Sequence, residues 1–75
     1  MKTKIPCSIL QDCPWCHSKP MIIQDPIRGY KGNFDYYVAC INPNCKVNPH
    51  TQYYNDIYES ATKSIENAIN DWNNR

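Results

Sequence analysis

Four of the five cysteines in this 75-residue chain form two close pairs, and their spacing constrains the fold more than any other feature of the sequence. The first pair has the spacing C-x2-C and the second C-x4-C, with residues 17–39 between them. Cysteine pairs at such spacings are typical of tetrahedral zinc sites with four thiolate ligands. The members of the two pairs are Cys13 with Cys16 and Cys40 with Cys45.

The segment between the pairs predicts a hairpin that brings them together. Residues 20–27 and 34–40 are rich in β-branched and aromatic residues and predict two strands, while residues 28–33 contain both glycines and predict the loop between them. One cysteine pair precedes the first strand and the other ends the second, so an antiparallel hairpin places both at one end. We therefore expect a structural Zn²⁺ site, closed by four protein ligands and without an open position for a substrate.

The sequence also allows other uses of these cysteines. A redox C-x2-C motif belongs in a βαβ setting, which a short chain with a second cysteine pair does not offer. A Cys3His site would use His17 or His50 in place of one thiolate. Cys7 is left over and is interpreted as a free or buried thiol. His17 and Lys46 each follow the second cysteine of a pair, where the backbone often takes a left-handed conformation that suits glycine best.

The size of the chain explains why a metal ion would be needed. Below roughly 70–80 residues a hydrophobic core alone supplies little net stability, and a metal or disulfides usually supplement it. We expect residues 1–75 to form a single zinc-ribbon domain. The sequence shows no secretory signal and no stretch able to span a bilayer, which favours a reducing cytoplasm where stable disulfides are rare. The odd cysteine count also excludes complete pairing within one chain.

The remaining segments complete the predicted fold. Residues 1–11 predict an irregular arm, residues 50–58 a third strand, and residues 60–73 a helix with Ser60 or Thr62 as its N-cap. The expected fold class is a small zinc-bound α+β zinc ribbon with a three-stranded antiparallel sheet and one C-terminal helix. An apolar stripe at helical spacing predicts the buried face of that helix: Ala61, Ile65, Ala68, Ile69 and Trp72.

Charge and motifs limit the function classes. The formal net charge is +1, and residues 51–75 carry two basic and four acidic side chains. A nonspecific nucleic-acid binder usually has a clear basic excess, because phosphate contacts supply most of its affinity. The sequence contains no glycine-rich phosphate loop and no Ser-His-Asp arrangement, so we expect no enzymatic activity.

Two tyrosine-rich segments keep a nucleic-acid alternative open. "GYKGNFDYY" and "QYYNDIY" resemble a base-stacking platform with nearby lysine and arginine, although the same aromatics can fill a small core. Trp15 lies at the tip of the first cysteine turn, where we expect it to be exposed to a partner. The candidate partner contacts are Trp15, Lys19, Arg28, Tyr30, Lys31 and Lys46.

Three motifs carry a resemblance to a known family. They are "CPWCHS" at 13–18, "YYVAC" at 36–40 and "ENAINDWNNR" at 66–75, with Cys45 completing the second pair. The chain resembles, over residues 12–75, a family of short phage and prophage zinc ribbons, the family of the restriction alleviation protein Lar. It departs from the family pattern in lacking a glycine after each cysteine pair and in having C-x4-C in place of a second C-x2-C.

This resemblance implies a function in the cytoplasm of an infected bacterium. The protein would modulate host defence by binding a bacterial protein complex, such as a type I restriction-modification system, so that methylation is favoured. Zinc would then hold the shape of a contact surface, and the chain itself would catalyse no reaction. The alternative is a nucleic-acid-binding zinc ribbon that serves phage transcription or replication.

Overall fold

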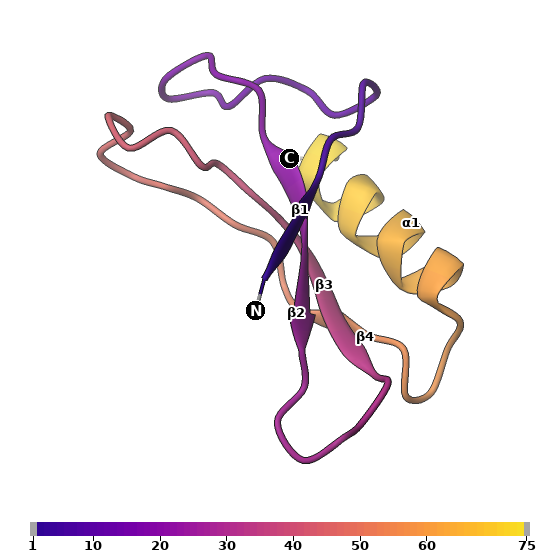
Figure 1. Cartoon of the computed structure of the whole chain (residues 1–75). Coiled ribbons are helices and arrows are strands. Elements are labelled where there is room, and N and C mark those ends of the chain that lie inside the picture. The colour runs from indigo at the N-terminus through magenta and orange to yellow at the C-terminus, as the bar shows by residue number, and fades with distance from the viewer. Residues whose placement is uncertain (1, 75) are drawn as a thin grey trace.

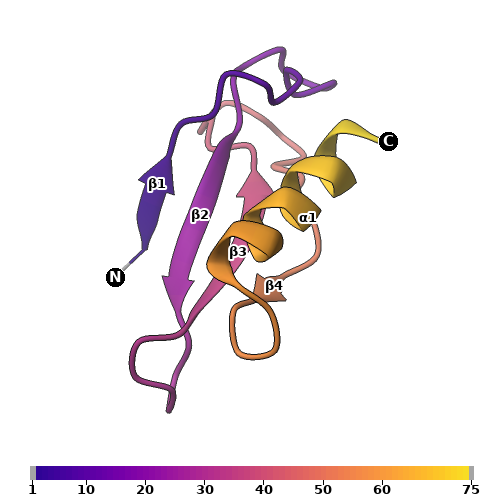
Figure 2. The same cartoon turned by 90° about the vertical axis from the view of Figure 1, so that its right-hand side faces the viewer.

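The computed structural model describes residues 2–74, so Met1 and Arg75, the last residue of the family-like motif, lie outside the described residues. The strands form one antiparallel sheet in the order β1-β2-β3-β4, and α1 crosses one face of it (Figure 1 and Figure 2). The expected α+β class is confirmed, but the sheet has four strands rather than three. The elements are β1 (Thr3–Ile5), β2 (Met21–Pro26), β3 (Phe34–Ala39), β4 (Tyr54–Asn55) and α1 (Ala61–Asn73).

The additional strand, β1, lies in the segment that was predicted to be an irregular arm. Thr3 pairs with Gln24 and Ile5 with Ile22, which places β1 along the outer edge of β2. The pairing satisfies backbone groups of β2 that would otherwise form an open edge, and Ile5 packs against the core. Three residues are too few to show an alternating pattern, so no local signal predicts this strand.

The central hairpin agrees with the prediction to within one residue at each strand end. β2 and β3 pair from Met21 opposite Ala39 to Pro26 opposite Phe34. Both glycines of the connecting loop have positive φ, 88° at Gly29 and 80° at Gly32, a conformation that other residues adopt only at a cost. The start of β2 and the end of β3 therefore lie side by side, as the cysteine spacing requires.

The predicted third strand over residues 50–58 is interrupted by a bulge. His50 pairs with Ala39 and Tyr54 with Tyr36, so residues 51–53 lie opposite only residues 37 and 38. The buried Thr51 fills the gap, because its Oγ1 accepts a hydrogen bond from the Val38 amide at 3.0 Å. Only Tyr54–Asn55 then continues as β4.

The helix follows the prediction closely. Ser60 is the N-cap, and its Oγ accepts a hydrogen bond from the Lys63 amide at 3.1 Å. The predicted stripe packs on the sheet, with Ala68 and Trp72 buried in the core. Ser64 is also buried, and its hydroxyl donates a 2.7 Å hydrogen bond to the Asn55 carbonyl. This bond fastens the N-terminal half of α1 to β4.

The last turn of α1 holds the segment before the first cysteine pair. The Trp72 indole Nε1 donates to the Gln11 carbonyl at 2.8 Å. The side chain of Asn73 forms two bonds of 3.0 Å: its Oδ1 accepts from the Gln11 backbone N–H, and its Nδ2 donates to the Ile9 carbonyl. These three bonds, which we call the helix-end clamp, hold Leu10 in the core, where it is 2% exposed.

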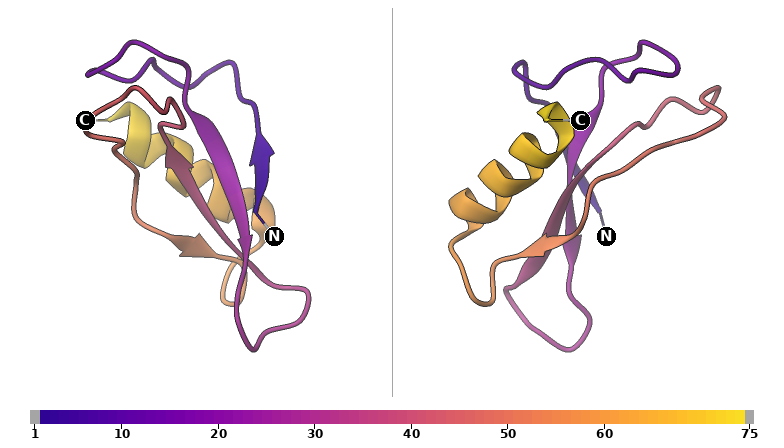
Figure 3. Two further views of the ribbon diagram at one scale, coloured as in Figure 1. Left: turned by 60° about the vertical axis from the view of Figure 1, so that its left-hand side comes forward. Right: turned by 180° about the vertical axis from the view of Figure 1, so that it is seen from behind.

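A second, smaller cluster covers the sheet face that α1 leaves open, the face seen in the left view of Figure 3. The Tyr37 ring is stacked on Tyr53 with centroids 4.4 Å apart and planes 5° from parallel. His50 meets Tyr37 edge-on at 6.1 Å, and the Lys2 ammonium lies 6.0 Å from the Tyr37 centroid. Tyr37 is consequently buried without any contribution from the helix.

Asp35 opposes folding at neutral pH, and its removal is expected to stabilise the protein. Burial and the nearby Asp25 and Asp56 raise the pKa of Asp35, and Asp25 lies directly opposite it on β2. A carboxyl whose pKa is higher in the folded state destabilises folding once it is ionised, and this penalty disappears as pH falls below the unfolded pKa.

We expect Asp35→Asn to raise the unfolding free energy at pH 7 on the order of 0.5 kcal/mol, the size of a cross-strand like-charge repulsion. Thermal unfolding of the zinc-bound protein at pH 7 measures the effect, and the gain should shrink at high ionic strength, which screens the repulsion from Asp25 and Asp56. The exposed helix variant Glu66→Gln is the control. An equal gain at low and at high ionic strength would contradict the electrostatic explanation.

Candidate metal centre

Four cysteine sulfurs meet at one end of the β2–β3 hairpin. The four Sγ atoms all lie within 4.8 Å of one another, with Cys13 and Cys45 at 4.0 Å and Cys16 and Cys40 at 3.4 Å. Four thiolates around one zinc ion, each about 2.3 Å from it, would lie about 3.8 Å apart, whereas disulfide sulfurs lie about 2.05 Å apart. The cluster therefore consists of free thiols arranged so that they can hold a metal ion.

The first cysteine turn is closed by two backbone hydrogen bonds. The His17 amide donates to the Cys13 carbonyl at 2.8 Å, and the Cys13 amide donates to the Ser18 carbonyl at 2.9 Å. His17 has a φ of 61°, which confirms the left-handed conformation expected there. The turn points both sulfurs inward and leaves Trp15 54% exposed, as predicted.

The second turn is wider, and this changes which residue is left-handed. The Cys45 amide donates to the Asn42 carbonyl at 3.0 Å, and the Asn44 amide donates to Asn42 Oδ1 at 3.0 Å. The expectation for Lys46 was wrong: Asn48 carries the positive φ, 47°. The Asn48 amide donates to Cys45 Sγ at 3.3 Å. Asparagine tolerates this conformation better than lysine does.

The two turns are also joined directly. The Asn42 side-chain amide donates to the Ser18 hydroxyl at 2.9 Å, and the Cys40 amide donates to the Pro49 carbonyl at 3.0 Å. The first bond crosses between the turns and the second closes the base of the second one. Together they hold the four sulfurs in place through contacts other than metal–ligand bonds.

The thiols differ in their affinity for protons. A backbone hydrogen bond from Ser18 lowers the pKa of the Cys16 thiol to about 6, whereas burial raises the pKa of Cys40 to about 12. A buried thiolate at Cys40 is therefore unfavourable without a positive charge beside it. A bound divalent cation supplies that charge and deprotonates coordinating thiols.

The geometry suits a metal that supports the fold. Cys13, Cys40 and Cys45 are buried and Cys16 is half-buried, and four protein ligands complete a tetrahedral site. Neither histidine joins the cluster: His17 Nε2 and Nδ1 lie outside it, and His50 stands beside Tyr37. The chemistry of the donor set is therefore all-thiolate, as the cysteine spacing predicts.

Cys7 lies apart from the four clustered sulfurs. Its thiol is free and half-buried, and its side chain packs against the hydrophobic core. The interpretation of Cys7 as a leftover thiol therefore agrees with its position. It also makes Cys7 a natural control in experiments on the metal site.

The predicted partner contacts do not form one surface. Trp15, Lys19 and Lys46 belong to the cysteine end, while the hairpin loop with the other three candidates, Arg28, Tyr30 and Lys31, lies at the opposite end of β2 and β3 (Figure 1). The Lys19 ammonium lies 3.4 Å from both the Asp12 carboxylate and the Leu10 carbonyl, so its charge is partly neutralised. The Lys19 side chain therefore helps to hold the segment that contains Leu10 and Asp12.

Sequence reasoning missed one exposed residue at the cysteine end. Val47 is 49% exposed and lies in the second turn. The sequence contained a signal for this residue, because an apolar side chain within a turn cannot reach the hydrophobic core and is therefore expected to be exposed. Trp15 and Val47 together give each turn one exposed apolar side chain.

Comparisons with protein-family models, with curated proteins and with solved structures found no match to this chain. Among residues 2–74, no helix is both long and apolar enough to cross a membrane. What the fold and the site establish is therefore a small α+β protein with four clustered cysteines that can hold a metal ion.

The left-handed residue after Cys16 gives a prediction about the first turn. We expect His17→Val to destabilise the metal-bound protein by about 1–2 kcal/mol, because a β-branched side chain is disfavoured at a φ of 61°. We expect His17→Gly to have a far smaller effect. Chemical denaturation in the presence of zinc measures both. Equal losses in the two variants would instead indicate that the imidazole itself is needed.

Proposed function

We propose that this chain is a zinc-ribbon protein whose zinc ion is structural and whose cysteine turns present a protein-binding surface. The surface, called the knuckle surface below, comprises Trp15, His17, Lys46 and Val47, all exposed. One observation carries the proposal: four sulfurs close the metal site completely, while a large aromatic side chain stands 54% exposed directly beside it. Exposed tryptophans are enriched among the residues that dominate binding at protein interfaces.

The resemblance to the Lar family suggests the partner class. On that basis the partner is a bacterial protein complex, such as a type I restriction-modification system, and the setting is the cytoplasm of an infected bacterium. The helix-end residues Trp72 and Asn73 contact backbone atoms of residues 9–11. They thus support the fold, which leaves the knuckle surface as the part that a partner would contact. Binding alone would alter the partner's activity, and no reaction is assigned to this chain.

A pull-down with Trp15→Ala tests the proposal. Bacterial lysate should yield one stoichiometric protein partner with the wild-type chain, and the variant should bind that partner about thirtyfold more weakly, as expected for a residue worth about 2 kcal/mol. Tyr30→Ala is the matched control, because Tyr30 is equally exposed but lies in the hairpin loop. Recovery of nucleic acid alone, or equal effects of the two variants, would contradict the proposal.

A nucleic-acid-binding role is the second candidate, and the open sheet face favours it. Tyr53 is 52% exposed, although its ring is stacked on Tyr37 and meets His50 edge-on at 5.8 Å, so part of the ring is accessible to a base. The adjacent Lys2 is only loosely paired with Asp25, at 3.9 Å. Fluorescence titration with single-stranded DNA and RNA across a salt series tests this role. Binding should strengthen as salt falls and be lost in Tyr53→Ala; absence of binding at low salt eliminates it.

A further inference from the structure

A groove lies between β4 and the N-terminal half of α1, on the part of the molecule away from the cysteines. It has a volume of about 190 Å³ and is bordered by residues 53–55, Tyr58 and Glu59 on one side and by Ser64 and Asn67 of α1 on the other. This volume far exceeds what one water molecule needs and is enough for the end of a long side chain.

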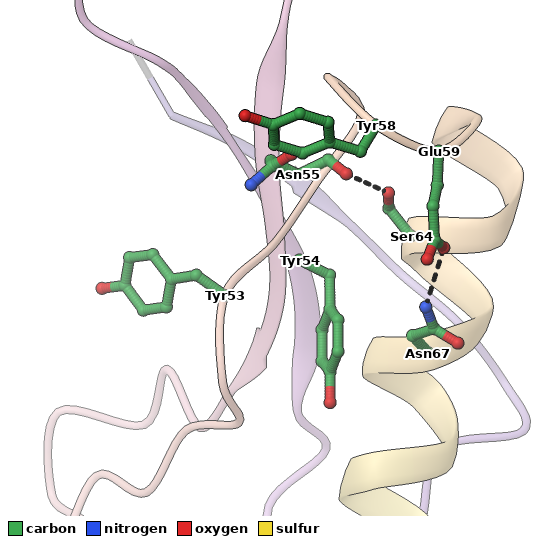
Figure 4. A pocket seen from close by; sticks show the side chains of 7 residues that line it. All are labelled: Tyr53, Tyr54, Asn55, Tyr58, Glu59, Ser64 and Asn67. Atoms are coloured by element: carbon green, nitrogen blue, oxygen red, sulfur yellow. Dashed lines mark hydrogen bonds between the residues drawn. The ribbon is translucent and has the colours of Figure 1, made fainter.

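One carboxylate is fixed at this groove. The Asn67 side-chain amide donates to Glu59 Oε2 at 3.1 Å, and Figure 4 shows the two side chains facing each other along α1. The ion pairs formed within residues 2–74 are Lys2 with Asp25 and Lys19 with Asp12, so neither involves Glu59. A carboxylate accepts several hydrogen bonds, and Glu59 therefore keeps capacity for a cationic donor.

Two tyrosines place aromatic rings at the groove. The Tyr54 ring is held in place by a 3.3 Å hydrogen bond from its hydroxyl to Asp71 Oδ2. Tyr58 is 89% exposed, and its ring lies over Asn55 on the same side of the groove as Tyr54 (Figure 4). The Ser64 hydroxyl is already used in its bond to the Asn55 carbonyl. The groove thus offers aromatic faces and one carboxylate, which together form a suitable site for a flat cation.

We propose that this groove binds an arginine side chain of the protein partner. A guanidinium group is planar, stacks on aromatic rings and donates two parallel hydrogen bonds to a carboxylate. Charge favours it as well, because residues 51–74 contain four acidic side chains and Lys63 as their one basic side chain. The inference rests on the proposed protein-binding function for the source of the arginine, and it adds a second contact to the knuckle surface.

Because the groove lies at the N-terminus of α1, binding of a cation there should depend on the carboxylate of Glu59. The N-terminus of α1 carries a partial positive charge that repels a cation within its first turn, and that turn contains no acidic side chain to offset it. Glu59 immediately precedes the N-cap and is the acidic residue that lines the groove. Neutralising it should therefore weaken arginine binding at least about tenfold, as expected for loss of a hydrogen bond between charged groups.

An NMR titration of the zinc-loaded chain tests this inference. The probe is N-acetyl-arginine methylamide, compared with its neutral citrulline isostere and with N-acetyl-lysine methylamide. We expect arginine to shift the side-chain amide signals of Asn67 and the ring signals of Tyr54 and Tyr58 in a saturable manner. Citrulline should give no such shifts, and lysine should bind more weakly because it lacks the planar group.

Two variants complete the test. Glu59→Gln should weaken arginine binding at least tenfold, whereas Glu66→Gln, an acid on α1 that does not line the groove, should leave it unchanged. Equal binding of arginine and citrulline, equal binding of arginine and lysine, or no effect of Glu59→Gln would each overturn the inference. The titration needs no partner protein, so its failure is distinguishable from failure of the Trp15→Ala pull-down.

Discussion

Cys40→Ser is expected to leave the chain unfolded even with zinc in excess. Cys40 is 5% exposed and its sulfur lies 3.4 Å from the sulfur of Cys16, where β3 ends at the cluster of four cysteines. Structural zinc sites contribute about 10–16 kcal/mol to folding in small zinc-binding peptides, which matches or exceeds the usual net stability of a domain, about 5–15 kcal/mol. Far-ultraviolet circular dichroism with and without a chelator measures the loss of structure.

The other cysteines provide the controls for this experiment. Serine at Cys13, Cys16 or Cys45 should have the same effect, whereas Cys7→Ser should retain both folding and metal, since Cys7 lies outside the cluster. Metal analysis of the wild-type chain should give one zinc ion per chain. A wild-type chain that stays folded and free of metal after chelation would show that the cluster is not needed for stability.

The second large effect is expected from Trp72→Ala. Trp72 is 2% exposed in the core, so truncation should cost about 3–5 kcal/mol through lost contacts and the cavity that remains. It also removes the donor for the Gln11 carbonyl, which loosens the helix-end clamp. Chemical denaturation of the zinc-bound protein measures the change, and a loss below about 1 kcal/mol would contradict the importance of the clamp.

Trp72→Phe separates the two contributions. Phenylalanine keeps most of the apolar contact but removes the indole N–H that donates to the Gln11 carbonyl, which should cost about 0.5–1.5 kcal/mol because Gln11 is exposed to water. The matched control is Asn70→Ala, on the exposed side of the same turn, which should change stability by less than about 0.5 kcal/mol. If Trp72→Phe lowered the unfolding free energy no more than the control does, the hydrogen bond from Trp72 to Gln11 would not contribute to stability.

The parts of the fold that sequence reasoning predicted are those set by local pattern. Two strands and an amphipathic helix leave a periodic signal in neighbouring residues, and the two glycines mark the loop between the strands. The meeting of the cysteines follows from the hairpin alone, because antiparallel pairing determines which strand ends are adjacent. The fold class and the four clustered cysteines were therefore accessible before the structure.

The parts that were not predicted depend on distant contacts. β1 forms because β2 has a free edge, and Thr51 creates a bulge because its hydroxyl replaces a backbone acceptor for Val38. The helix-end clamp joins residues 9 and 11 to residues 72 and 73 through hydrogen bonds that no local pattern reveals. The groove beside Glu59 likewise needs β4 and α1 to be placed in space. Such features follow from tertiary packing, which outweighs local propensity.

The four clustered cysteines all precede α1 in the chain, so they are synthesised before the helix. All four metal-binding candidates and the hairpin that unites them precede residue 46, whereas the clamp must wait for Trp72 and Asn73. Chains emerge from the ribosome N-terminus first, so the four thiols leave the ribosome before the residues of α1 do. We therefore expect metal binding at the hairpin to precede closure of the helix-end clamp over Leu10.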